Sequence, residues 1–323
     1  MTNLPSRPAR RQKRAVWIKQ NGVFLAFALI FAVMLVAAPQ FGTRENLTNI
    51  LQQNAIIGII ACGMTFAIII GGFDLSVGST AAMASVVTAY VIIESSGNGV
   101  PLGIIAALAT GLIVGSINGA LIAFVRINPF VVTLGTMTII RGLVFVATDA
   151  TPLFGVPMGF TQLGLGKSFG VPNVAIVFLG VALLLGALLH QTRFGHHVFA
   201  AGGNARAAAV MGIRTDRIRF GSYLIASVCA AIAGVLLVGQ TASGQPQAAM
   251  GYELTAIAAV IVGGASLGGG RGRMIGTVAG VFLLGMVSNA LNLLGVSPFW
   301  QPVATGLILI FAVGLDRSKT DAL

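Results

Sequence analysis

The sequence predicts an all-α integral membrane protein with about ten transmembrane helices, an internal repeat and glycine-broken helices. Its 323 residues are 56% hydrophobic and only 8% charged, and the mean hydropathy is +0.94. A soluble domain carries about 25% charged residues, so this chain cannot cover a water-facing surface. Its apolar runs are long enough for helices rather than for barrel strands.

The candidate spans form one transmembrane domain, 22–315, between a basic N-terminal segment, 1–21, and a short tail, 316–323. The first run follows a basic cluster and has only a weak cleavage site after it, so we interpret it as an uncleaved span. The ten candidates are residues 22–38, 51–72, 76–93, 101–125, 129–148, 173–191, 220–240, 254–270, 274–294 and 300–315.

The net charge of +11 marks topology rather than nucleic-acid binding. An even number of spans puts both termini on one side. If that side is the cytoplasm, 16 of the 19 Lys and Arg residues lie there, as the positive-inside rule requires. Only Arg44 and Lys167 fall outside, and Arg141 lies within a span.

Glycines have two uses in this chain. Gly111, Gly115 and Gly119 share one face of a predicted helix, which we interpret as a packing face. A second pattern is an internal echo, because AIIIGGFDLSVGS from Ala67 resembles AVIVGGASLGGGR from Ala259. Glycine-interrupted helices at matching places in two halves indicate a central solute path. The sequence leaves open whether the two copies are parallel or inverted.

Asp74 lies in the first of these interruptions. A carboxylate at the centre of a span costs about 2.5–3.5 kcal/mol, so such residues usually have a role. One role is local, with Asp74 or Ser76 capping a helix that begins near Val77. The other is contact with the solute or a gate, and the two are compatible. For Arg141 the simplest interpretation is snorkelling to an interface.

Most other polar residues within the spans are uncharged Asn, Thr and Ser. Their amides and hydroxyls both donate and accept hydrogen bonds, which suits a neutral polyol better than an anion. Each residue could instead join two helices with no solute involved. The predicted path, including the broken segment itself, consists of Phe73, Asp74, Ser76, Asn54, Asn118, Asn289 and Asn292.

The sequence predicts no catalytic residue, metal site or cofactor bound by this chain. Cys62 and Cys229 lie in apolar runs, and the three histidines lack the spacing of a zinc helix. The nearest match to a phosphate-binding loop is Thr161–Ser168, TQLGLGKS, in which Thr161 stands where the pattern requires Gly. The chain is therefore not predicted to hydrolyse ATP.

Three long motifs, together with a shorter one, resemble the ribose-type permeases of ATP-binding-cassette (ABC) sugar importers. They are GMTFAIIIGGFDLSVGS, TRFGHHVFAAGGNARAAAVMGI from Thr192, and GYELTAIAAVIVGGASLGGGRGRMIGTVAG from Gly251, with NALNLLGVS from Asn289. The resemblance covers most of residues 50–315. Phe73 stands where members of the family commonly carry Ile.

The resemblance implies several partners and a location. Such permeases pair as dimers in a bacterial inner membrane, with cytoplasmic N- and C-termini expected here. They bind a separate cytoplasmic ATPase, which carries ATP and Mg²⁺, and receive solute from a periplasmic binding protein. Which sugar is carried, and whether the dimer has identical subunits, stays open.

The resemblance also places an ATPase-coupling helix in the basic cytoplasmic loop at about 192–219. Asn204 can cap a short helix over Ala205–Met211 that ends at Gly212. A solvated loop with no partner is the alternative. The residues implied in coupling are Gly202, Gly203, Asn204, Ala205, Ala208, Met211 and Gly212.

Two other classes of transporter compete with an ABC permease. An ion-coupled secondary transporter would use Asp74, although such proteins usually carry several intramembrane acids. A channel would need a ring of selecting charges, which the sequence lacks.

Overall fold

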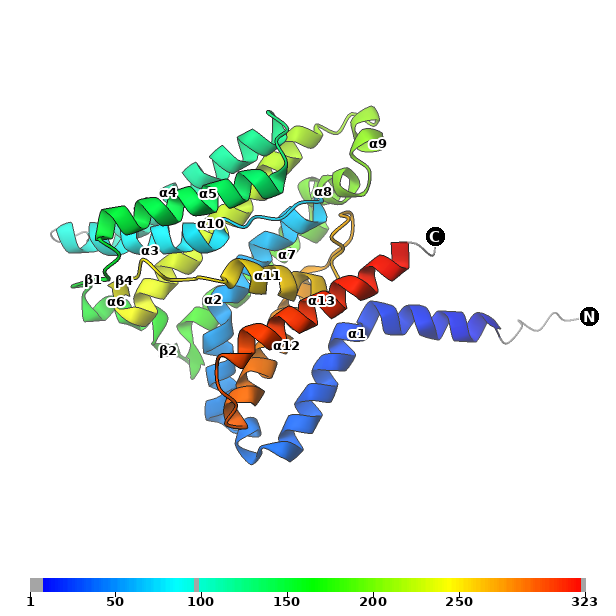
Figure 1. Cartoon of the computed structure of the whole chain (residues 1–323), viewed down its shortest axis with the longest axis horizontal. Coiled ribbons are helices and arrows are strands. Elements are labelled where there is room, and N and C mark those ends of the chain that lie inside the picture. Colours follow the sequence, from blue (N-terminus) through cyan, green and yellow to red (C-terminus); the bar gives the residue numbers. More distant parts are fainter. Residues whose placement is uncertain (1–7, 96–98, 321–323) are drawn as a thin grey trace, which may run out of the picture.

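The computed structural model describes residues 8–95 and 99–320, and within them the chain is a bundle of helices (Figure 1). In chain order the helices are α1 (Pro8–Ala37), the 3-10 helix η1 (Pro39–Gly42), α2 (Arg44–Ile69), α3 (Val77–Glu94), α4 (Gly99–Ala123), α5 (Pro129–Thr148), α6 (Met158–Gly164), α7 (Asn173–Gln191), α8 (Arg193–Gly203), α9 (Ala205–Val210), α10 (Thr215–Thr241), α11 (Tyr252–Val262), α12 (Met274–Leu293) and α13 (Trp300–Thr320).

The described helices confirm the all-α membrane class. Those long and apolar enough to cross a membrane are the seven helices α2, α3, α4, α5, α7, α10 and α12. Three shorter apolar stretches occupy the remaining predicted spans: Gly22–Ala37, Tyr252–Val262 and Trp300–Phe311. The count of ten full-length spans is therefore not confirmed.

The predicted span 254–270 was wrong in its second half. Helix α11 ends at Val262, and the chain then runs through turns and irregular backbone to Met274. Gly264, Gly269 and Gly270 all have positive φ there, a conformation that no helix continues. Hydropathy alone counts this glycine-rich stretch as apolar, whereas its backbone ends the helix.

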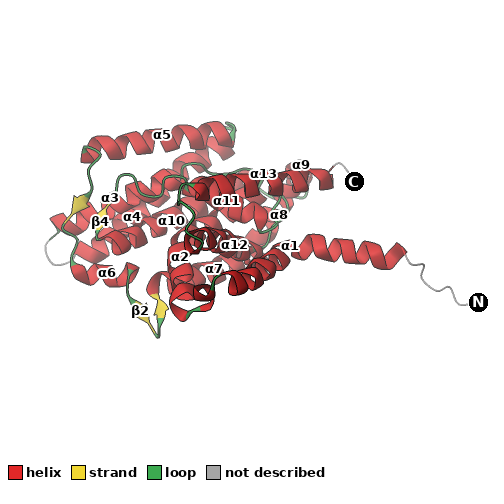
Figure 2. Cartoon of the chain, turned by 60° about the horizontal axis from the view of Figure 1, so that its bottom comes forward, coloured by secondary structure: helices red, strands yellow, loops and turns green. Residues whose placement is uncertain are grey.

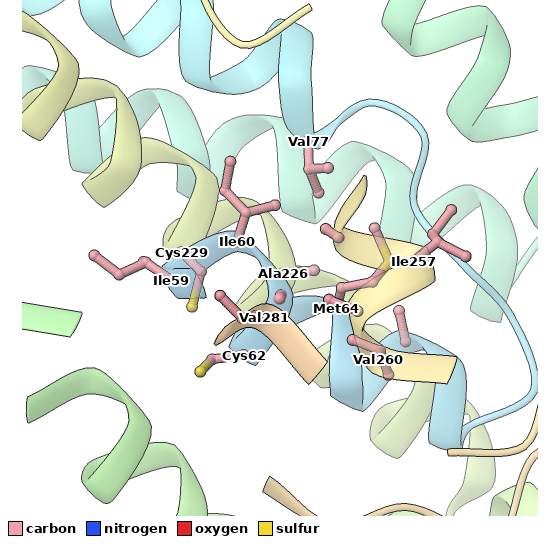
Figure 3. Close-up of a cluster of buried hydrophobic side chains, with 14 of the residues drawn as sticks. Ile59, Ile60, Cys62, Met64, Val77, Ala226, Cys229, Ile257, Val260 and Val281 are labelled. Atoms are coloured by element: carbon pink, nitrogen blue, oxygen red, sulfur yellow. The ribbon is translucent and has the colours of Figure 1, made fainter. Parts of the chain in front are cut away.

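The core of the bundle lies around α2 and α10, which are mostly buried by their neighbours. Side chains from α2, α10, α11 and α12 meet in one hydrophobic cluster that includes Met64, Cys229, Val260 and Val281 (Figure 3). Cys62 and Cys229 are both buried and free. In contrast, α4, α5 and α7 bury only a minor share of their surfaces, as helices that face lipid or another subunit do.

The predicted glycine face of α4 is confirmed. A Cβ added to Gly111 would lie 2.7 Å from that of Ala231, and one added to Gly115 would lie 2.9 Å from the Cα of Leu224. Gly119 packs against Phe220 in the same way. Because α10 approaches α4 so closely along this face, side chains there would force the two helices apart.

The terminal helices extend beyond the predicted boundaries. Helix α1 begins before residue 22, and its N-terminal part projects away from the bundle (Figure 1 and Figure 2). Helix α13 likewise continues past residue 315. The predicted segment 1–21 is therefore helical from Pro8, while residues 1–7 and 321–323 lie outside the described part.

Short strands connect the helices at the end of the bundle away from α9 (Figure 1). Strand β1 (Leu153–Phe154) pairs with β4 (Ser243–Gly244), and β2 (Lys167–Ser168) pairs with β3 (Val171–Pro172), both antiparallel. Lys167 and Ser168, the end of the near-match to a phosphate-binding loop, thus lie in a hairpin. The next helix, α7, begins only at Asn173 after the second strand of this hairpin, so Lys167 and Ser168 do not have the geometry of a phosphate-binding loop, in which a helix begins at these residues.

Candidate functional site

The first glycine interruption is a regular helix end followed by an extended turn. The amides of Gly71 and Gly72 donate to the carbonyls of Ile68 and Ala67, both at 2.9 Å, and Gly71 has a φ of +86°. This is the Schellman arrangement, which needs a residue in the left-handed region and therefore favours Gly.

The second interruption repeats this geometry. Gly264 donates to the carbonyl of Ile261 at 2.8 Å, and Ala265 donates to that of Val260 at 3.2 Å. Gly264, with a φ of +93°, therefore corresponds to Gly71. The structural match is shifted by one residue from the sequence match, in which Gly263 aligns with Gly71.

Asp74 is fully buried and holds the turn after the first interruption. Its Oδ1 accepts from the backbone amide of Ser76 at 2.8 Å and from the Ser76 hydroxyl at 2.6 Å. Helix α3 begins at Val77, as predicted, but neither side chain accepts from its first-turn amides. The prediction that Asp74 or Ser76 caps this helix was therefore wrong. The side chain of Asp74 instead closes a local Asx-type turn.

A chain of side-chain hydrogen bonds connects this turn to two neighbouring helices. Asn118 of α4 donates to Ser76 Oγ at 2.9 Å, and Thr136 of α5 donates to Asn118 Oδ1 at 2.7 Å. Ser227 of α10 lies beside the carboxyl group of Asp74. Ser227 Oγ and Asp74 Oδ2 are both buried without a hydrogen bond in the described structure. The inner part of the network is closed to solvent, because Asp74, Ser76 and Asn118 are each 0% exposed, whereas Thr136 at its outer end is half-buried.

Two aromatic residues flank the first interruption. Phe73 packs edge-on against Phe130 of α5, with ring centroids 6.2 Å apart. Tyr223 of α10 is fully buried, and its hydroxyl lies against Gly72 without a hydrogen-bond partner. No pattern in the sequence points to Tyr223, because only the fold brings it to Gly72.

The remaining predicted path residues fall in different places. Asn54 lines a cavity of about 520 Å³ between α2, α11, α12 and α13. Asn289 exchanges two hydrogen bonds with Asn46 of α2, at 2.8 and 3.0 Å, and thus joins two helices. Asn292 is exposed and accepts from Gln301 of α13 at 2.9 Å.

The segment implied in coupling forms two short helices at one end of the bundle. The side chain of Asn204 caps α9 by accepting from the amide of Ala207 at 2.9 Å. The helix ends at Val210, and Gly212 follows with a φ of +84°. The predicted capped helix is therefore confirmed, within a residue at its C-terminal end. Val210 and Met211 are 87% and 81% exposed, so two apolar side chains project outward here.

The same segment meets both glycine interruptions at a three-way backbone junction. The amide of Gly270 donates to the carbonyl of Ile69, the last residue of α2, at 2.8 Å. Gly202 of α8 lies so close that a Cβ added there would collide with this same carbonyl. A Cβ on Gly269 would in turn lie 2.7 Å from the carbonyl oxygen of Gly202. We call this contact of Ile69, Gly202 and Gly269–Gly270 the glycine junction.

The glycine junction lies at the end of one broken helix and beyond the end of the other. Helix α2 ends at Ile69 within the junction, whereas α11 ends at Val262 and the irregular segment after it supplies Gly269 and Gly270. No group of His, Cys, Asp and Glu suited to a metal ion occurs among the described residues.

Comparisons with known proteins agree with this architecture. A family model described as branched-chain amino acid transport system / permease component matches residues 46–313. No solved structure matches the chain significantly. Among curated relatives, the ribose import permease protein RbsC of Bacillus subtilis is 44% identical over 305 residues, 94% of each chain.

Two Escherichia coli relatives match to a similar extent. The ribose import permease protein RbsC is 37% identical over 318 residues, covering 96% of this chain and 97% of the relative. The L-arabinose transport system permease protein AraH is 40% identical over 307 residues, covering 95% and 93%. With nearly full-length matches of this kind, the chain belongs to the ribose-type family of sugar ABC transporter permeases.

Proposed function

We propose that this chain is the transmembrane permease subunit of an ATP-driven importer that passes a monosaccharide such as ribose into the cytoplasm. The observation that carries the proposal is the near full-length similarity to permeases named for ribose, arabinose and allose. A periplasmic binding protein delivers the sugar, and a separate subunit hydrolyses the ATP. Two copies of the permease form the path.

The coupling segment is proposed to be the docking site for the ATPase. Its support is the exposed apolar pair Val210 and Met211 next to a capped helix, because exposed apolar side chains at a loop are typical of contact surfaces. The glycine junction would then pass a movement of α8 to the end of α2 and to the segment that follows α11. Both termini lie in the cytoplasm under this proposal.

Asp74, Ser76 and Asn118 are proposed to keep the first broken segment in register beside the sugar path. Their support is the closed hydrogen-bond chain from Thr136 to Asp74. Asn54 is proposed to contact the sugar directly, since it lines the cavity of about 520 Å³ between α2, α11, α12 and α13.

Reconstitution in liposomes tests the proposed function. With the ATPase and binding-protein subunits from the same organism, ribose uptake is expected to require ATP on the side of the membrane where the ATPase is bound. Permease alone is expected to show no accumulation under a proton or sodium gradient. Ion-driven accumulation without the ATPase would reject the proposal in favour of a secondary transporter that uses Asp74.

A further inference from the structure

An open cavity that carries two charged side chains, here called the charged cavity, lies beside the start of α11. It measures about 410 Å³ and is lined by Met137, Thr138, Arg141 and Gly142 of α5 and by Met250, Gly251 and Glu253. Its two ionisable residues lie within helices of a membrane protein, where unneeded charges are costly. A cavity of this size would hold a monosaccharide together with water.

Arg141 does not simply reach for an interface. Its Nη1 donates to the backbone carbonyls of Pro246 and Ala248, at 2.7 and 3.1 Å, and thereby holds the loop that leads into α11. The guanidinium group has further N–H donors, none of which makes a hydrogen bond to another described residue. These donors remain available at the cavity wall.

Glu253 supplies the complementary acceptor. It lies in the first turn of α11, where its Oε1 accepts weakly from the amide of Gly251 at 3.3 Å. Gly78 of α3 packs directly against its other oxygen, Oε2, which makes no hydrogen bond to a described residue. No ion pair within 4.0 Å joins Glu253 to Arg141 in the described structure. Each charge therefore keeps unused hydrogen-bonding capacity.

The charged cavity adjoins the larger cavity lined by Asn54. The two share Met250 and Gly251, and the side chain of Met250 is 63% exposed between them. The lining of the larger cavity contains the uncharged polar residues Gln53, Asn54, Thr255, Ser288, Gln301 and Thr305. The two cavities thus lie side by side along the N-terminus of the half-length helix α11, and polar side chains lie among the apolar lining of both.

We propose that Arg141 and Glu253 form a transient binding station for the hydroxyl groups of a sugar in transit, with Met250 at its mouth. A polyol can donate hydrogen bonds to the carboxylate and accept them from the guanidinium in the same pose. Glu253 would repel a simple anion, and Arg141 would repel a simple cation. This inference rests on the proposed function, since it names the point on the path at which the solute is held.

Protection of an introduced cysteine tests the station without disturbing its charges. In the reconstituted transporter carrying Met250→Cys, a small neutral maleimide is expected to react several times more slowly in saturating D-ribose. Phe169→Cys, at a fully exposed hairpin tip, is expected to react at the same rate with or without ribose. The parent cysteines are buried, so background labelling is low. Unchanged labelling of Met250→Cys in ribose would overturn the station.

A charge-neutral variant gives the second arm. Glu253→Gln keeps the shape of the side chain and is expected to lower ribose uptake per ATP about tenfold, as the loss of one charge-assisted hydrogen bond predicts. Glu94→Gln, an exposed change at the end of α3, is expected to leave it unchanged. ATP-dependent uptake at the parent level in Glu253→Gln would reject the station while leaving the proposed function intact. In the labelling experiment, protection of Met250→Cys by leucine rather than by ribose would reject a polyol as the occupant.

Discussion

Replacing Gly202 by alanine is expected to reduce ATP-driven uptake to near background. The new Cβ would collide with the carbonyl oxygen of Ile69 and would lie 2.9 Å from the amide nitrogen of Gly270. Both neighbours are backbone, so no flexible side chain can give way. Overpacking of this kind costs about 1–3 kcal/mol, and separating Ile69 from Gly270 would lose their hydrogen bond as well.

The adjacent glycine supplies a matched control. A Cβ on Gly203 would meet only the Cα of Gly270, at 3.9 Å, which is ordinary contact. Both substitutions raise helix propensity in α8 by about 1 kcal/mol, so that contribution cancels in the comparison. Gly203→Ala is expected to retain most of the parent uptake, measured together with extraction yield and basal ATPase activity. Equal uptake by the two variants would show that the glycine junction does not control transport.

Asp74→Ala is expected to have the second largest effect, lowering uptake more than Asn118→Ala does. Removing the Asp74 carboxyl group leaves both the amide and the hydroxyl of Ser76 without their acceptor, inside a site that water does not reach. Each unsatisfied buried group costs about 1–3 kcal/mol. Asn118→Ala leaves the turn closed and removes only its links to α4 and α5.

Asp74→Asn separates a positioning role from a proton-carrying one. An amide oxygen can still accept both hydrogen bonds from Ser76, so this variant is expected to restore much of the uptake lost in Asp74→Ala. An ion-coupled mechanism predicts the opposite, since an amide cannot take up a proton near neutral pH. Parent-level uptake in a well-expressed Asp74→Ala variant would remove Asp74 from the mechanism altogether.

The sequence was informative wherever the signal is local. Apolar run lengths placed the long helices, the glycine pairs marked both interruptions, and the cap at Asn204 was read from neighbouring residues. The same local reasoning failed at 254–270. Glycines end α11 at Val262 there, although they do not lower the hydropathy of the segment enough to indicate a break. It also failed at Asp74, whose side chain accepts from Ser76, just before the helix, instead of from the amides of the first helical turn.

The remaining features depend on contacts between distant parts of the chain. For Asn289 the sequence leaves open a place on the path or a link between two helices, and it does not identify the hydrogen-bond partner Asn46, 243 residues away. Arg141 was interpreted as snorkelling, whereas it holds a loop more than a hundred residues further along. The glycine junction joins three segments whose glycines could be recognised individually but not paired. A single sequence carries no pattern that specifies such pairings.

The most direct test of the account is the labelling of Met211→Cys by a membrane-impermeant maleimide, with and without the ATPase subunit. Met211 is 81% exposed beside α9, and the two parent cysteines are buried. Without the ATPase, we predict rapid labelling from the cytoplasmic face. With the ATPase bound, we predict that this labelling is blocked. Labelling from the periplasmic face, or labelling that the ATPase leaves unchanged, would contradict a coupling segment that drives the end of α2 and the segment that follows α11 through the glycine junction.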